Sequence, residues 1–509
     1  EKLAMSKKAL SYLAAVVASL LALTSCVTVS SASSAAMNAN FKSVADYEKQ
    51  KVDWKSCGTD LYCGSVRVPM DWSKPASKKI TLAVIYHRAS ANKPLGSLLV
   101  NPGGPGASGF NFVKDSIDGF ATERLRANYN IVGFDPRGVQ NSSAIRCLNG
   151  KSMDRFLYGT TGYELGSSKD LAKTKLVMAN FIKACKKNTG ELLGFVDTVS
   201  AAKDMDIIRA VMGDSKLNYL GFSYGTQLGA TYAALFPKKV GRMVLDGAID
   251  PSVPDSQQSI NQIKGFDLAL RDYMADCLKN AGCPFTGSVE DGLAKIRAFL
   301  KQVEATPLTS TDNKREVSIW AVNTGIIMAL YSQDYWQYLT AAFKAAFKGD
   351  GTTLLRLADF YNDRDADGTY TSNLTEANIS ISCLDSRQSS KLSDMKAQNQ
   401  RMLKASPTLG RYWQWGGIAC AKWPYPVVKK VKNMSATGAP TIVVVGTTGD
   451  PATPYEQAVS LAHKILKKGY LVTYKGEGHT AYGRSNSCVN SAVDNFFIDG
   501  KLATNEPVC

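Results

Sequence analysis

The sequence predicts an α/β fold in which a mostly parallel sheet is interrupted by a helical insertion. Short apolar runs of strand type recur in the first half of the chain and again near its end, each closing on a turn rich in Gly, Pro or Asp. Between them, residues 251–435 show helical periodicity and few strand signals. The 509 residues, 45% of them hydrophobic, suffice for one large domain with an insertion or for two to three domains.

Strand patterns alternate with helical patterns in the first half. The strand-type runs are 62–68, 80–87, 96–101, 129–134, 217–220 and 240–245. Helical patterns dominate 151–215, including an amphipathic run over 199–212, and a further helix is expected over 226–236. This alternation predicts a mostly parallel sheet with functional residues at the carboxyl ends of its strands.

The second half of the chain contains the helical insertion and then a return of the strand pattern. Helices are expected at 260–279, 289–303 and 319–347, and the aromatic-rich run 413–425 suits either core packing or the lining of a substrate pocket. The sheet pattern resumes at 441–445 and 470–474, with helices expected at 455–466 and 488–497. We expect a signal peptide (1–26), a flexible tether (27–50), a core in two parts (51–250 and 436–509) and a helical cap (251–435).

The N-terminus has the features of an export signal. Lys7 and Lys8 precede an apolar run over 9–23 that is too short for a convincing membrane span. Leu23-Thr24-Ser25-Cys26 resembles a bacterial lipobox, which predicts lipidation of Cys26 and a membrane anchor. The alternative is ordinary signal-peptide cleavage near residues 34–36. Either way, we expect an exported protein, secreted or held at the outer face of the membrane.

Cysteine usage agrees with export. Apart from Cys26, ten cysteines remain, an even number that allows up to five disulfides. Proximity along the chain favours three pairs and leaves two more, namely Cys57–Cys63, Cys277–Cys283 and Cys488–Cys509, then Cys147–Cys185 and Cys383–Cys420. No metal site is expected, since no C-x-x-C pair exists and the chain has only three His.

The net charge of +16 is spread along the chain rather than gathered in a long basic run. Nucleic acid is therefore not expected as a partner. A diffuse excess of lysine favours solubility or attraction to an anionic envelope surface.

One stretch carries a candidate nucleophile. Gly221-Phe222-Ser223-Tyr224-Gly225 lies between an apolar strand pattern and a helical one. In such a strand–turn–helix unit the serine lifts its hydroxyl clear of the sheet edge. The G-x-S-x-G pattern alone is weak, so Ser223 needs partners.

Two partners follow later strands. His479 lies in a Gly-flanked loop just after a strand pattern, unlike His87 and His463, and is the candidate base. Asp450 also follows a buried strand pattern and would hold the second imidazole nitrogen, although Gly-Asp-Pro is also a common turn. The chain order Ser, Asp, His is that of α/β-hydrolases.

An acyl-transfer site also needs donors for an oxyanion. The N–H of Tyr224 is one candidate because it directly follows the serine. The second is expected from Gly104, in the Gly/Pro-rich loop 102–109 after an early strand.

Six motifs in order carry a family resemblance: NPGGPGASG, DPRGVQNSS, VSAAKDMDIIRAVMG, NYLGFSYGTQLGATYAALFP, GDPATP and GEGHTAY. Over about 55–250 and 440–509 the chain resembles the actinobacterial tripeptidyl aminopeptidases, a branch of the α/β-hydrolases. The resemblance implies an exported serine exopeptidase that releases short N-terminal peptides, with a helical cap over the active site. We expect a monomer without a cofactor that acts on peptides with a free N-terminus and releases tripeptides. It places Ser223 as nucleophile, His479 as base and Asp450 as its orienter. Pro102 stands where the wider branch has His, so release of single prolines is not inferred.

An aminopeptidase must also bind a free amine, and an acidic side chain in the cap would do so. Asp385 is our candidate, with Glu376 behind it. Two other functions stay open: a carboxylesterase or lipase-like hydrolase with the same triad, and a non-catalytic lipoprotein that binds peptides or wall components.

Overall fold

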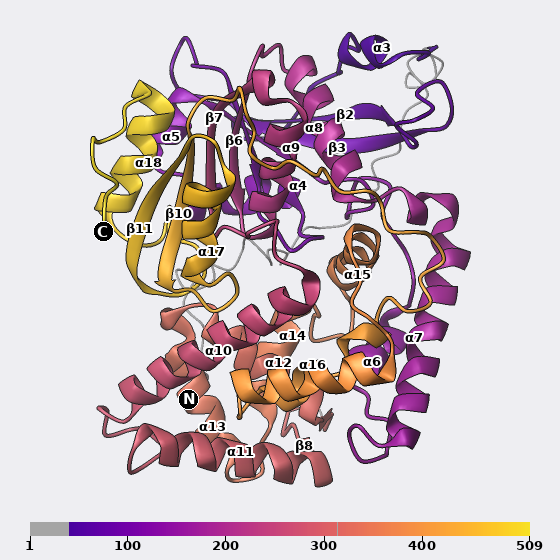
Figure 1. Cartoon of the computed structure of the whole chain (residues 1–509), viewed down its shortest axis with the longest axis vertical. Coiled ribbons are helices and arrows are strands. Elements are labelled where there is room, and N and C mark those ends of the chain that lie inside the picture. Colours follow the sequence, from indigo (N-terminus) through magenta and orange to yellow (C-terminus); the bar gives the residue numbers. More distant parts are fainter. Residues whose placement is uncertain (1–39, 313) are drawn as a thin grey trace.

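A nine-stranded sheet forms the centre of the upper part of the molecule in Figure 1. The computed structural model describes residues 40–312 and 314–509. The strand order is β1-β2-β3-β5-β4-β6-β7-β10-β11. The strands span β1 (Lys55–Gly58), β2 (Leu61–Pro69), β3 (Lys79–His87), β4 (Ser97–Asn101), β5 (Asn130–Phe134), β6 (Leu217–Phe222), β7 (Val240–Asp246), β10 (Ile442–Gly449) and β11 (Gly469–Glu477). A separate small sheet pairs β8 (Leu308–Thr309) with β9 (Glu316–Val317).

The type of strand pairing changes once across the sheet, at β5. The pairs β1–β2, β2–β3 and β3–β5 are antiparallel, whereas every pair from β5 to β11 is parallel. Successive residues of the parallel strands point to opposite faces, as the two-residue period of a strand requires. Leu220 and Val244 thus join one hydrophobic cluster, whereas Tyr219 and Met243 join another. The mostly parallel sheet predicted from the sequence is confirmed.

Helices cover both faces of this sheet, so the parallel strands β4, β5, β6, β7 and β10 are largely buried and rich in Val, Ile and Leu. One face is covered by α4 (Gly109–Phe120), α5 (Glu123–Asn128) and α18 (Ser487–Asp499). The other face is covered by α8 (Thr198–Val211), α9 (Tyr224–Leu235) and α17 (Tyr455–Ser460). This layering leaves the carboxyl ends of the parallel strands as the edge at which side chains from different strands meet.

The insertion after β7 is helical, as expected. Its helices are α10 (Asp255–Cys277), α11 (Val289–Ala305), α12 (Ile319–Leu330), α13 (Trp336–Ala346), α14 (Thr352–Tyr361), α15 (Leu374–Asp385) and α16 (Leu392–Ala405). Most of them enclose a hydrophobic cluster of their own, below the sheet in Figure 1. In contrast, α15 lies between the sheet and the other helices of the insertion. Its Ala377 and Ile381 join the hydrophobic cluster on the sheet face that α8, α9 and α17 cover.

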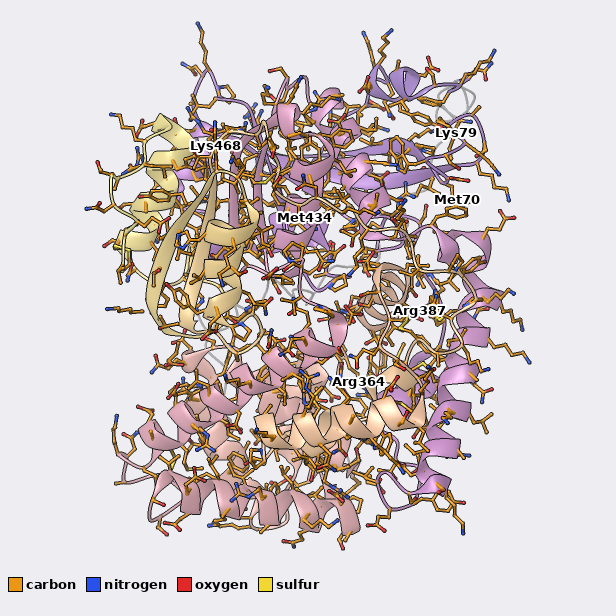
Figure 2. All side chains as sticks on the ribbon, viewed as in Figure 1. Met70, Lys79, Arg364, Arg387, Met434 and Lys468 are labelled. Atoms are coloured by element: carbon orange, nitrogen blue, oxygen red, sulfur yellow. A yellow bond between two sulfur atoms is a disulfide. The ribbon has the colours of Figure 1, made fainter. Side chains whose placement is uncertain are left out.

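Two helices from the first half of the chain lie beside the insertion. These are α6 (Gly150–Tyr158) and α7 (Ser168–Thr189), and Tyr158 joins the hydrophobic cluster of the insertion. Arg364, labelled in Figure 2, donates to the Asp154 carboxylate at 2.6 and 2.9 Å and so ties the end of α14 to α6. The cap is therefore built from two separate parts of the sequence.

Two local predictions need correction. The tether prediction is wrong for residues 41–48, because Phe41 and Tyr47 stack at 4.5 Å and are buried, and Val44–Glu48 forms the helix α3. The helical run predicted over 319–347 is broken between α12 and α13, where Gln333–Tyr335 forms a short 3₁₀ turn. The aromatic run 413–425 serves core packing. Trp413 packs against the hydrophobic cluster of the insertion, and Trp423 belongs to the cluster on the sheet face that α8, α9 and α17 cover.

Five disulfides cross-link the described chain: the three pairs that sequence proximity favoured, Cys57–Cys63, Cys277–Cys283 and Cys488–Cys509, and the two pairs left over, Cys147–Cys185 and Cys383–Cys420. The predicted signal peptide and the lipidation site Cys26 lie outside the described residues. Within residues 40–312 and 314–509, no helix has the length and apolar character needed to cross a membrane.

Candidate active site

Ser223 occupies a sharp turn between β6 and α9. Its backbone has φ 58° and ψ −125°, a conformation that costs a non-glycine residue free energy. A Cβ on Gly221 would collide with the carbonyl of Gly225, and one on Gly225 would lie 2.7 Å from the Asn101 carbonyl oxygen. The two glycines therefore allow the close approach of strand and helix that the turn requires.

His479 and Asp450 form a hydrogen-bonded pair at the neighbouring strand ends. Asp450 directly follows β10, His479 lies two residues after β11, and Nδ1 of His479 lies 2.9 and 3.0 Å from the two Asp450 carboxylate oxygens. Asp450 is only 2% exposed and accepts from the N–H groups of Ala452 and Thr453 at 3.0 and 2.9 Å. The Thr453 hydroxyl donates to the same carboxylate at 3.0 Å. These bonds fix the carboxylate, and the carboxylate orients the imidazole.

Ser223 and His479 line one cavity of about 340 Å³ at the carboxyl edge of the sheet. The structure therefore brings the three predicted triad residues together: two in the cavity wall and Asp450 behind them. An imidazole that is held through Nδ1 has Nε2 free to act as a base toward a serine hydroxyl.

The loop after β4 lies directly against the serine turn. A Cβ on Gly103 would lie 2.9 Å from the Ser223 Cβ, so only glycine fits there. The Gly103 N–H already donates to the Asn101 side chain at 2.9 Å, whereas Gly104 lines the cavity. Tyr224 is the first residue of α9, where a helix leaves N–H groups without intrahelical partners. Of the two predicted oxyanion donors, Gly104 therefore borders the cavity, and Tyr224 directly follows Ser223, which also lines it.

Sequence reasoning missed three residues that hold the loop around His479. The buried Asp246 carboxylate accepts from the N–H groups of Ala481 and Tyr482, at 3.0 and 2.7 Å, and its carbonyl accepts from Ser223 N–H at 2.9 Å. Burial raises the pKa of Asp246 to about 6. Its place at the end of a buried strand was the signal that could have identified it.

The other two are Tyr331 and Arg484. The Tyr331 carbonyl, at the break after α12, accepts from His479 N–H at 2.8 Å, and the two rings meet edge to face at 5.6 Å. Arg484 donates to the carbonyl oxygens of Glu477 and His479 at 3.0 and 3.1 Å. The cap thus contacts the histidine directly, which no local sequence pattern indicates.

The structure does not bring the two predicted amine-binding acids into the cavity. Glu376 accepts from the N–H groups of Cys147 and Leu148, at 2.6 and 3.0 Å, and is 7% exposed. Asp385 accepts from the N–H and hydroxyl of Thr198, at 2.8 and 2.5 Å, and burial raises its pKa to about 7. Both carboxylates attach α15 to the core, so this placement contradicts the prediction that they bind a substrate amine from the cavity.

The cavity wall is mainly aromatic and aliphatic. Six of its aromatic side chains are Phe112, Phe120, Phe222, Tyr331, Tyr361 and Tyr482. Among the described residues that line it, none is Asp or Glu, and Arg484 is the one Lys or Arg. In the same part of the chain, no three His, Cys, Asp or Glu side chains gather in a way that could hold a metal ion.

The strand order and the strained serine turn define an α/β-hydrolase fold, and the serine and paired histidine at its cavity make the protein a serine hydrolase. The sequence profile described as "TAP-like protein" matches residues 406–509. Over 488 residues the chain is 36% identical to "Serine protease Hip1" of Mycobacterium tuberculosis, covering 90% of this chain and 91% of that one.

Two further relatives carry different names. "Carboxylesterase B" of Mycobacterium tuberculosis is 38% identical over 447 residues, or 86% of this chain and 84% of that one. "Tripeptidyl aminopeptidase" of Streptomyces lividans is 30% identical over 475 residues, or 90% and 86% of the two chains. The chain belongs to this tripeptidyl aminopeptidase family of α/β-hydrolases.

Proposed function

We propose that the protein is an exported serine aminopeptidase that releases short N-terminal fragments, of tripeptide length, through an acyl-enzyme on Ser223. The observation that carries the proposal is that His479 and Ser223 line one cavity, with Asp450 bound to His479 at 2.9 Å behind the cavity wall. A buried carboxylate behind an imidazole beside a strained serine is the arrangement that activates a serine hydroxyl.

In the proposed reaction His479 takes the proton from the Ser223 hydroxyl as the oxygen attacks the scissile carbonyl carbon. The N–H groups of Tyr224 and Gly104 bind the oxyanion of the tetrahedral intermediate. His479 then gives the proton to the leaving amine, and the C–N bond breaks to leave an ester on Ser223. Water, deprotonated by His479, attacks that ester, and the acid product leaves while Ser223 regains its proton.

The charge of the cavity wall bears on the length of the released fragment. Release of a single residue would place the substrate's ammonium group one residue from the scissile carbonyl, where an acidic partner would be needed. No Asp or Glu among the described residues lines the cavity. In a tripeptidyl substrate the ammonium lies three residues away, about 10 Å along an extended chain. Binding of the amine outside the cavity therefore favours release of longer fragments, as does the relative named tripeptidyl aminopeptidase.

Export is proposed on two grounds. Five disulfides are typical of proteins that fold in an oxidising compartment. The sequence before residue 40 has a basic segment, an apolar run and the lipobox-like Cys26. We propose a monomer, either secreted or anchored to the outer face of the membrane through lipid on Cys26.

A carboxylesterase is the second candidate function. The acid-free cavity wall and the relative named carboxylesterase B favour it. An esterase would use the same Ser223 chemistry but would not require a free amine on its substrate.

A substrate panel separates the two candidates. Tripeptide and single-residue amides, each free and N-acetylated, are assayed beside short acyl esters, with Ser223→Ala as the inactive control. The proposal predicts turnover of free tripeptide amides and a large loss of kcat/KM on acetylation. Equal rates on free and acetylated peptides would refute the aminopeptidase proposal and favour the carboxylesterase.

A further inference from the structure

We propose that the part of the cavity beside Ser223 selects a bulky, uncharged, apolar side chain on the acyl side of the scissile bond, over small side chains and over cationic ones. This inference rests on the proposed acyl-enzyme and adds the substrate class. In a released tripeptide, the selected side chain is that of the third residue.

The apolar wall is built around three phenylalanines next to the nucleophile. Phe112 and Phe120, both on α4, stack with ring centroids 3.9 Å apart. Phe222, the residue directly before Ser223, meets these rings edge-on at 5.9 and 6.2 Å. All three line the cavity and are at most 6% exposed, so the wall is held by the packing of the core. A rigid aromatic wall next to the reacting carbonyl suits an apolar group.

Charge in the wall opposes a cationic group. Among the described lining residues, Arg484 is the one permanently charged side chain, and its Nε and Nη2 are fixed by the carbonyl oxygens of His479 and Glu477. His479 also becomes positive while it holds the serine proton. Asp450 lies behind His479, but it is held by His479 and by the N–H groups of Ala452 and Thr453, and no carboxylate of the described residues lines the cavity itself. An ammonium group in this cavity would therefore lose its water beside the Arg484 guanidinium without gaining a carboxylate partner, which is unfavourable.

The size of the cavity also favours a bulky side chain. About 340 Å³ lies at the lower end of the range for ligand pockets in proteins, which is roughly 300–1,000 Å³. A methyl group would leave much of this apolar surface unoccupied. A larger apolar side chain would remove that surface from water, with an expected gain of about 10- to 100-fold in kcat/KM.

The first test is a series of tripeptide coumarin amides, Ala-Ala-Xaa, in which Xaa is alanine, norleucine, phenylalanine or lysine. Norleucine and lysine share a straight carbon chain, so that pair isolates the effect of the charge. We expect kcat/KM for norleucine and phenylalanine to exceed that for alanine by about 10- to 100-fold. We expect lysine to fall at least 10-fold below norleucine. Lysine equal to norleucine, or alanine equal to phenylalanine, would overturn the inference.

A charge-introducing variant gives a second, independent test. Thr375 lines the cavity at the second position of α15, where the helix N-terminus favours a carboxylate, so Thr375→Asp should fold. We expect it to raise the lysine-to-norleucine ratio of kcat/KM about 10-fold, whereas the near-isosteric Thr375→Asn should not. An unchanged ratio in a folded Thr375→Asp would contradict the charge argument, and if that variant does not fold, the wild-type series decides alone. Labelling of Ser223 by a fluorophosphonate separates failure of this inference from failure of the proposed function. A labelled enzyme whose kcat/KM values do not follow the expected order refutes only this inference, whereas an unlabelled Ser223 refutes the proposed function.

Discussion

Replacing Asp246 by alanine should impair catalysis more than its distance in sequence from His479 suggests. The Asp246 carboxylate accepts from the N–H groups of Ala481 and Tyr482, the second and third residues after the histidine. Its carbonyl accepts from Ser223 N–H at 2.9 Å. Asp246 therefore links the serine turn to the histidine loop, and we regard it as a positioning residue.

The size of the effect follows from these contacts. Without the carboxylate, two buried N–H groups lose their acceptor, at about 1–3 kcal/mol each, or about 2–6 kcal/mol if nothing moves. A loop that shifts to recover these bonds moves His479 with it, and a displacement of about 1 Å costs on the order of 100-fold in rate. We expect Asp246→Ala to lower kcat about 100-fold, with a smaller change in KM, and to reduce the free energy of unfolding by a few kcal/mol.

The assay compares kcat and KM for a good amide substrate, normalised to the active sites titrated with a fluorophosphonate, with urea unfolding of the same samples. Asp206→Ala is the matched control. Asp206 is 4% exposed on α8 and is bound by Arg209 and Lys239, so its loss should reduce stability while leaving kcat per titrated site unchanged. If Asp246→Ala loses stability but keeps kcat within about 3-fold of wild type, the positioning role is refuted.

Two further predictions concern other buried hydrogen bonds. Thr453→Val should lower kcat/KM about 10-fold, because the hydrogen bond of 3.0 Å from the Thr453 hydroxyl to the Asp450 carboxylate is lost. Thr453→Ser keeps the hydroxyl and should keep the wild-type kcat/KM. Equal kcat/KM for the wild type and both variants would show that this hydrogen bond does not contribute to catalysis. Asp385→Asn should flatten the pH dependence of stability. Since burial raises the pKa of Asp385 from 3.8 to about 7, its contribution is complete below about pH 4 and is lost as pH rises through 7. Urea unfolding from pH 4 to 8 should show a wild-type loss steeper than that of Asp385→Asn by up to about 1.4 kcal/mol per pH unit; identical slopes would contradict this reasoning.

The sequence allowed prediction of features whose determinants are local. Ser223, Asp450 and His479 each follow an apolar strand pattern, and parallel strands bring their carboxyl ends to one edge, so their proximity followed from the pattern alone. Three of the disulfides close loops between cysteines near in sequence. The four remaining cysteines allow three pairings, and the structure has the one that joins neighbours along the chain.

Features that depend on packing between distant segments could not be predicted. The contact of Tyr331 with His479 depends on two features: the break after α12, within the run 319–347 that the sequence pattern predicts to be one helix, and the packing of the cap on the core. Asp385 failed as an amine-binding candidate for a related reason. Only the fold shows that the N–H and hydroxyl of Thr198, far away in the sequence, occupy its two oxygens.

The most direct test of the account is covalent labelling of the nucleophile. Wild type, Ser223→Ala and the control Ser259→Ala, a serine on α10 outside the cavity wall, are treated with a fluorophosphonate and analysed by intact-mass and peptide mass spectrometry. The account predicts one adduct, on the peptide that contains Ser223, in wild type and Ser259→Ala, and none in Ser223→Ala. An adduct that persists in Ser223→Ala, or a wild type that is folded yet unlabelled, would contradict it.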